Sequence, residues 1–183
     1  MTVKEIIIAA ATELGIADEV CAFVNGESEE GKPKAEALLR CFNLVENELA
    51  LDYLPLYAEE VLETETGAVY YAELEKTAVR IVGIEDEWGN SVAFKLFPEY
   101  LKTQAGKICV RYTYTPTEKD MDGESDFTLY ASVRLFAYGV AAEYALANGE
   151  FEEAAVWDKK YKDAITAAYK LRSVKKIRSR RWV

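Results

Sequence analysis

The spacing of apolar residues changes twice along this 183-residue chain, and that change constrains the fold more than any single motif. Near the N-terminus, apolar side chains recur at i, i+3 and i+4, the spacing of one face of a helix. Between residues 56 and 115 they alternate with polar side chains, as they do along a half-buried strand. After residue 127 the helical spacing returns. The sequence therefore predicts an α+β fold, mainly a helical bundle with an inserted small antiparallel β-domain.

Three helices are predicted before the strands. The first is expected to stop at Gly15, the second to cover residues 16–24, and the third to begin near Pro33, which the first turn of a helix tolerates. Pro55 ends this helical part. The buried stripe of the first helix is predicted to contain Val3, Ile6, Ile7, Ala10 and Leu14. That of the third is predicted to contain Leu38, Leu39, Phe42, Val45 and Leu49.

Four or five antiparallel strands are predicted in the middle of the chain. The clearest is KICVRYTY, which places Ile108, Val110, Tyr112 and Tyr114 on one face. A hairpin is predicted from 79–84, through a turn at Trp88-Gly89-Asn90, to 92–97. Further strands are expected at 57–63 and 68–74.

Two helices are predicted after the strands. The first, over residues 127–147, is rich in Ala, Gly and Ser, and Asn148-Gly149 closes it. The second is predicted to bury one stripe, made of Phe151, Ala154, Tyr161, Ala164, Ile165 and Ala168. The predicted domain bounds are therefore 1–55 for the N-terminal helices, 56–116 for the β-domain, 117–172 for the C-terminal helix pair, and 173–183 for a basic C-terminal arm.

The composition argues against an enzyme. There is no histidine, so the commonest general base and the commonest zinc ligand are absent. The three cysteines are far apart and unpaired in spacing, which favours reduced thiols in a reducing, cytosolic setting. The acidic loop that starts at Asp120 places Ala131 where a calcium-binding EF-hand needs a glutamate. We therefore expect no catalytic residue, no metal and no cofactor, and no apolar run reaches the length of a membrane span.

Charge is divided sharply along the chain. The last fourteen residues hold seven basic side chains and no acidic one, whereas residues 1–169 hold 15 basic and 32 acidic side chains. Such an arm can contact an acidic protein, nucleic acid or an anionic membrane, or simply aid solubility. We favour protein docking, because the acidic body repels DNA and because arginine and tryptophan are frequent at interface hot spots. The candidate partner-binding residues are Lys175, Lys176, Arg178, Arg180, Arg181 and Trp182.

Several segments resemble the head-to-tail connector proteins (adaptor or head-completion proteins) of tailed bacteriophages and prophages. In KTAVRIVGIEDEWGNSVAFKLFPEYLKTQAGKICVRYTYTP the similar features are a DxxGN-like turn from Asp86 to Asn90, Gly106 before a strand, and the Y-x-Y-x-P that ends at Pro116. The helix–turn–helix in AAEYALANGEFEEAAVWDKKYKDAI is also similar. The chain departs from some relatives in its long polar loop over residues 27–32.

The resemblance implies a structural protein of the phage neck, made in the host cytoplasm and located in the virion. It implies a homo-oligomeric ring, typically a dodecamer, that docks to the portal protein through the C-terminal arm and receives the next neck or tail completion protein. DNA would pass through the channel of the ring without specific binding, and no membrane is involved. The alternative is a host cytosolic scaffold or regulatory module whose basic arm binds an acidic protein or nucleic acid.

Overall fold

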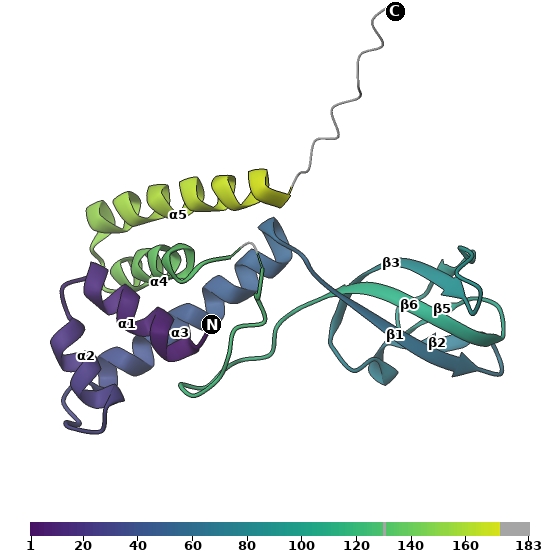
Figure 1. Ribbon diagram of the computed structural model, residues 1–183, viewed down its shortest axis with the longest axis horizontal. Helices are drawn as coiled ribbons and strands as arrows, with labels where there is room; N and C mark the ends of the chain where they lie inside the picture. Colours follow the sequence, from purple (N-terminus) through teal and green to yellow (C-terminus); the bar gives the residue numbers. More distant parts are fainter. Residues whose placement is uncertain (130, 173–183) are drawn as a thin grey trace, which may run out of the picture. The chain divides into compact units, whose positions relative to one another are not determined.

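The structure, a computed structural model, describes residues 1–129 and 131–172. Its fold is α+β, as predicted: five helices, in N-terminal and C-terminal parts, with two small antiparallel sheets between them (Figure 1). The chain divides into two compact units. We call them the helical unit, which contains Met1–Val45 and the chain from Lys119 onward, and the β unit, Glu46–Glu118.

The helical unit takes its helices from both ends of the chain. Thr2 caps the first helix, since its hydroxyl accepts a hydrogen bond from the Glu5 amide while the Glu5 carboxylate accepts one from the Thr2 amide. None of the helices in the described residues is long and apolar enough to cross a membrane. The elements are α1 (Val3–Glu13), α2 (Ala17–Val24), α3 (Lys32–Glu48, whose last three residues belong to the β unit), α4 (Val133–Ala147) and α5 (Phe151–Arg172).

Helix α4 forms the centre of the helical unit. It packs against α1 and α5, and the neighbouring course of α4 and α5 can be followed in Figure 1. Phe136 of α4 also meets Phe42 of α3, with ring centroids 5.5 Å apart. Gly139 makes this close packing feasible, because a Cβ there would lie 2.7 Å from Val45 Cγ1 and 2.9 Å from Tyr161 Cε2. The small residues of this segment therefore serve core packing.

Two details of the predicted C-terminal helices are wrong. The helix expected from residue 127 begins only at Val133, because the Ser132 hydroxyl accepts a hydrogen bond from the Leu135 amide and caps it there. Phe127 is nevertheless buried, with its ring 5.7 Å from that of Phe136. Phe151, expected on the buried stripe of the last helix, is 70% exposed because it occupies the first position of α5.

The β unit contains two three-stranded antiparallel sheets. A π-helical turn, Leu49–Tyr53, follows α3, and a 3₁₀ turn, Tyr71–Glu73, follows the second strand. In one sheet the order is β1-β6-β3, and in the other it is β2-β5-β4. The strands are β1 (Leu56–Thr64), β2 (Ala68–Tyr70), β3 (Ala78–Asp86), β4 (Lys95–Leu96), β5 (Tyr100–Lys102) and β6 (Gly106–Tyr114).

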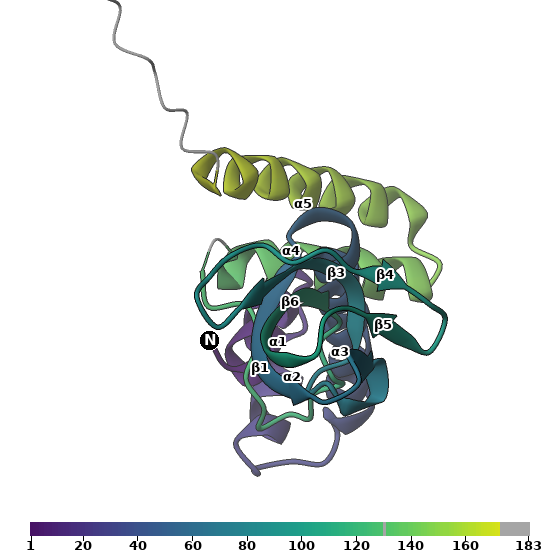
Figure 2. The ribbon, with the colours of Figure 1, turned by 90° about the vertical axis from the view of Figure 1, so that its right-hand side faces the viewer.

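Strand β6 organises the core of the β unit. It pairs with β1 over all nine residues, from Leu56 opposite Tyr114 to Thr64 opposite Gly106, and with β3 on its other side (Figure 2). The predicted alternation along β6 is confirmed, because Ile108, Val110, Tyr112 and Tyr114 are all buried in one cluster. Val69 of β2 and Leu101 of β5 belong to the same cluster, so the two sheets share one apolar core.

The predicted strand pairing differs from the observed one. The turn at Trp88-Gly89-Asn90 exists, but its second arm makes one bridge, Glu85 with Ser91, and β4 then pairs with β5 in the other sheet. The strand expected over 68–74 ends at Tyr70 in the 3₁₀ turn, and β3 carries two register shifts against β6. Pairing with β5 therefore takes the second arm of the predicted hairpin into the other sheet.

Candidate functional site

The partner-binding residues predicted from the sequence lie outside the described residues. These are Lys175, Lys176, Arg178, Arg180, Arg181 and Trp182, and their role stays a prediction. In the part of the chain that the structure describes, no group of three or more Cys, Asp or Glu side chains is arranged to hold a metal ion. The candidate sites on the described residues are therefore surfaces and grooves.

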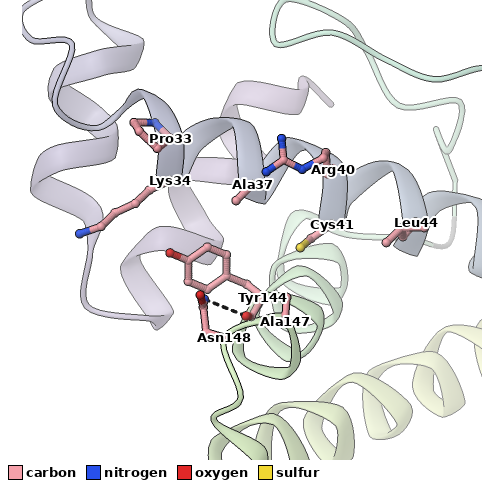
Figure 3. Close-up of a pocket in the computed structure, with 9 residues that line it drawn as sticks. All are labelled: Pro33, Lys34, Ala37, Arg40, Cys41, Leu44, Tyr144, Ala147 and Asn148. Carbon is pink, nitrogen blue, oxygen red and sulfur yellow. Dashed lines mark hydrogen bonds between the residues drawn. The ribbon is translucent and has the colours of Figure 1, made fainter.

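A groove with a volume of about 450 Å³ lies between α3 and α4, and we call it the α3–α4 groove (Figure 3). Cys41 of α3 lies between the two helices in the close-up, and Asn148, which caps α4, donates a hydrogen bond through its side chain to the Tyr144 carbonyl. The lining is mostly apolar, so the groove suits an apolar side chain. It is lined by Pro33, Lys34, Ala37, Arg40, Cys41, Leu44, Tyr144, Ala147 and Asn148.

The thiol in this groove is poorly suited to chemistry. Cys41 is buried, and burial raises its pKa to about 11, with the negative charge of Glu143 acting in the same direction. The thiolate, which is the nucleophile and the metal ligand, is therefore scarce at neutral pH. The groove is better equipped to bind than to react.

Two cations border the α3–α4 groove. The Lys34 Nζ lies 2.7 Å from Glu19 Oε2, and this hydrogen bond raises the pKa of Lys34. Arg40 is exposed, and it forms no ion pair with any of the residues that the structure describes. An apolar floor with an available guanidinium at its rim can recognise an apolar side chain that has a carboxylate beside it.

A second feature, in the β unit, is the tight turn from Asp86 to Asn90, which we call the Trp88 turn. The Asp86 carboxylate accepts hydrogen bonds from the Trp88 amide at 3.0 Å and the Asn90 amide at 2.8 Å, and from the Asn90 side chain at 3.0 Å. These bonds lower the pKa of Asp86. Gly89 has φ +81°, a conformation that favours glycine. One carboxylate thus fixes the turn, and the Trp88 side chain at its tip is 76% exposed.

The outer face of the β1-β6-β3 sheet is joined by an ion-pair network. Arg111 of β6 contacts Glu59 of β1 through Nε at 2.8 Å and Glu85 of β3 through Nη2 at 2.6 Å. Tyr57 and Val61 of β1 are exposed apolar side chains. Because Arg111 already has a carboxylate partner on each side, the network holds the three strands together, and the guanidinium of Arg111 is not available to a ligand.

Aromatic and basic side chains also meet between α4 and α5. Tyr138 stacks on Trp157 with ring centroids 5.8 Å apart, and the Lys160 Nζ lies 3.8 Å from the Trp157 ring centroid. The Arg134 Nε donates a hydrogen bond to the Tyr138 hydroxyl at 2.5 Å. The Tyr138–Trp157 stack joins the two helices, and both cations have partners within the molecule.

Sequence reasoning did not identify the α3–α4 groove or the exposure of Trp88. The groove is formed by residues about 100 positions apart, and no local pattern signals such a pair of helix faces. The turn itself was predicted, and its sequence contained a signal for the exposure of Trp88. Glu87 and Trp88 lie between Asp86 and Gly89-Asn90, at the tip of a tight turn, where side chains face solvent.

No protein-family model matches the chain, and no curated protein matches it.

Proposed function

We propose that this chain is a structural protein of a bacteriophage neck, which forms an oligomeric ring that docks to the portal, extends the DNA channel and connects head to tail. The observation that carries the proposal is the position of the segments that resemble connector proteins. The DxxGN-like turn is a rigid turn in the β unit, Y-x-Y-x-P spans the end of β6, and the GEFEEA segment, which starts at Gly149, contains the beginning of α5. Each motif therefore lies at a junction between elements, where it determines the course of the chain.

The charge of the β unit is compatible with a channel through which DNA slides. Residues 46–118 contain 14 acidic and 6 basic side chains. A surface of this sign repels phosphate and provides none of the clustered cations that bind a DNA backbone. It therefore supports passage of DNA better than capture of DNA.

The experiment that tests the proposal is co-expression with the portal protein that the proposal requires in the same phage or prophage, followed by co-purification and negative-stain electron microscopy. A ring of this protein bound to one face of the portal is the expected result. If the protein stays monomeric and separate from the portal, the proposal is wrong. Binding of a host protein or of nucleic acid in that case would support the cytosolic scaffold instead.

The arm is tested by a matched pair of variants. Replacement of Arg178, Arg180 and Arg181 by glutamine is expected to abolish portal docking, because it removes three cations of the proposed contact. The control replaces three cations elsewhere in the chain, Lys95, Lys107 and Lys159, which all have exposed side chains, and should retain docking. Equal loss in both variants would show that net charge, and no specific arm, governs the interaction.

A further inference from the structure

We infer that the Trp88 turn of one copy inserts its tryptophan into the α3–α4 groove of a second copy. The inference rests on the proposed ring, for which it names the contact between neighbouring subunits. It joins two features of the described residues that otherwise have no role: an apolar side chain presented to solvent by a fixed turn, and an apolar groove of about 450 Å³.

The turn is built to present a side chain. All three side-chain hydrogen bonds that hold it end on Asp86, and the Asp86 amide and carbonyl add backbone bonds to Asn90 and Gly89. Trp88 itself contributes only its backbone amide to this set. Because the backbone is already ordered, binding through Trp88 costs little conformational entropy. Tryptophan on such a support is the residue type most often found at interface hot spots.

The groove offers the matching surface. Ala37 and Cys41 provide small side chains between the helices, while Leu44 and the Tyr144 ring supply larger apolar walls. Leu44 is 60% exposed, so a large apolar surface there faces solvent in the single copy. Insertion of an indole would remove this surface from water and give it an aromatic neighbour.

Charge complementarity identifies the occupant as a second copy of this chain. Trp88 is preceded by Glu85-Asp86-Glu87, and Glu87 is exposed. The groove is bordered by Lys34 and by Arg40, which lacks a carboxylate partner among the described residues. A tryptophan beside an acidic side chain therefore meets an apolar groove beside a basic one.

The contact joins two different surfaces, because the turn belongs to the β unit and the groove to the helical unit. In the proposed ring, each copy gives its turn to one neighbour and its groove to the other, so association continues past two copies until the ring closes. A two-fold dimer would instead fill both grooves at once and stop at two copies, so wild-type assemblies larger than a dimer are expected. The contact predicts that a copy without the tryptophan and a copy with a filled groove can still pair once.

The test measures self-association of the full chain by sedimentation velocity over the widest accessible concentration range. Trp88→Ala should weaken association at least about 30-fold, as expected for an interface hot spot. Ala37→Trp, which fills the groove, should do the same. Phe151→Ala is the matched control, because Phe151 is 70% exposed but lies outside both features, and it should associate as the wild type does.

Mixing the two defective variants distinguishes this contact from other modes of association. A mixture of Trp88→Ala and Ala37→Trp should give heterodimers and nothing larger, since one turn and one groove remain intact. Arg40→Glu should weaken association, and Glu87→Arg in the same chain should restore it. Circular dichroism checks that each variant is folded, and Trp88→Phe is a second, milder test of the same side chain.

Three results would overturn the inference: a wild type that is monomeric at all concentrations, an unchanged Trp88→Ala variant, or a mixture that forms no heterodimer. The proposed function has a separate outcome, because a ring can assemble on the portal through other surfaces. Trp88→Ala rings on the portal that match wild-type rings would remove this contact and leave the neck proposal standing.

Discussion

Replacement of Gly139 by alanine tests whether the small residues of α4 exist for close packing. The added Cβ would lie 2.7 Å from Val45 Cγ1 and 2.9 Å from Tyr161 Cε2, whereas carbon atoms pack at about 3.5–4.0 Å. Both neighbours are buried, so neither can move into solvent. Overpacking of this kind costs about 1–3 kcal/mol, and the better helix propensity of alanine returns about 1 kcal/mol. We expect a net loss of about 1 kcal/mol in the free energy of unfolding.

The assay is urea unfolding followed by far-UV circular dichroism, with the midpoint and slope compared between variants. Gly83→Ala is the control, because no atom lies within 4 Å of a Cβ at Gly83, and it should be neutral or slightly stabilising. Val45→Ala removes the clashing methyl, so Gly139→Ala should cost less in that background than in the wild type. An unchanged or more stable Gly139→Ala single variant would refute the packing argument.

Three further predictions concern single side chains. Ser132→Ala should lower the free energy of unfolding by about 1 kcal/mol because the cap of α4 is lost, and Ser132→Asp should restore it; an unchanged alanine variant would contradict the capping role. Burial raises the pKa of Cys41 from its ordinary 9.0 to about 11, so the stabilisation this group provides is complete below pH 9 and is lost as the pH rises to 11. Between pH 9 and pH 11 the free energy of unfolding should therefore fall more steeply with pH for the wild type than for Cys41→Ala. Equal slopes for the two proteins would argue against the shift. Asp86→Ala removes three hydrogen bonds to a charged acceptor, so hydrogen exchange at the Trp88 and Asn90 amides should accelerate at least about tenfold; equal exchange rates would show that the turn is held by other contacts.

The elements whose burial follows from their own apolar spacing could be predicted from the sequence. The apolar stripe Val3, Ile6, Ile7 and Ala10 is buried as its spacing requires, and the alternation in β6 appears as four buried side chains on one face. In both cases, burial follows from a period that a single element imposes on its own sequence. Gly149, with φ +80°, likewise follows the end of α4, as the Asn-Gly pair indicates.

Features that depend on a distant partner could not be predicted. The segment 92–97 has strand character, but its pairing was decided by β5, which takes Lys95 and Leu96 into the second sheet. Helix α4 was expected from residue 127 but begins at Val133, and the loop before it is bonded to the N-terminus, with the Gly123 carbonyl accepting a hydrogen bond from the Val3 amide and the Ser125 amide donating one to the Met1 carbonyl. The α3–α4 groove is a further case, because it requires two helices to meet. In each case the missing information is tertiary.

The strand order of the β unit has a consequence for synthesis. All residues of this unit are described, and among its strands β6 is the partner of both β1 and β3, just as β5 is the partner of both β2 and β4. Both central strands come after the strands that they join. As the chain leaves the ribosome, the edges of β1 and β3 that pair with β6 therefore stay unpaired until residues 106–114 emerge. A translation product that stops before Gly106 would expose these edges together, which makes incomplete chains prone to aggregation while complete ones close both sheets at nearly the same moment.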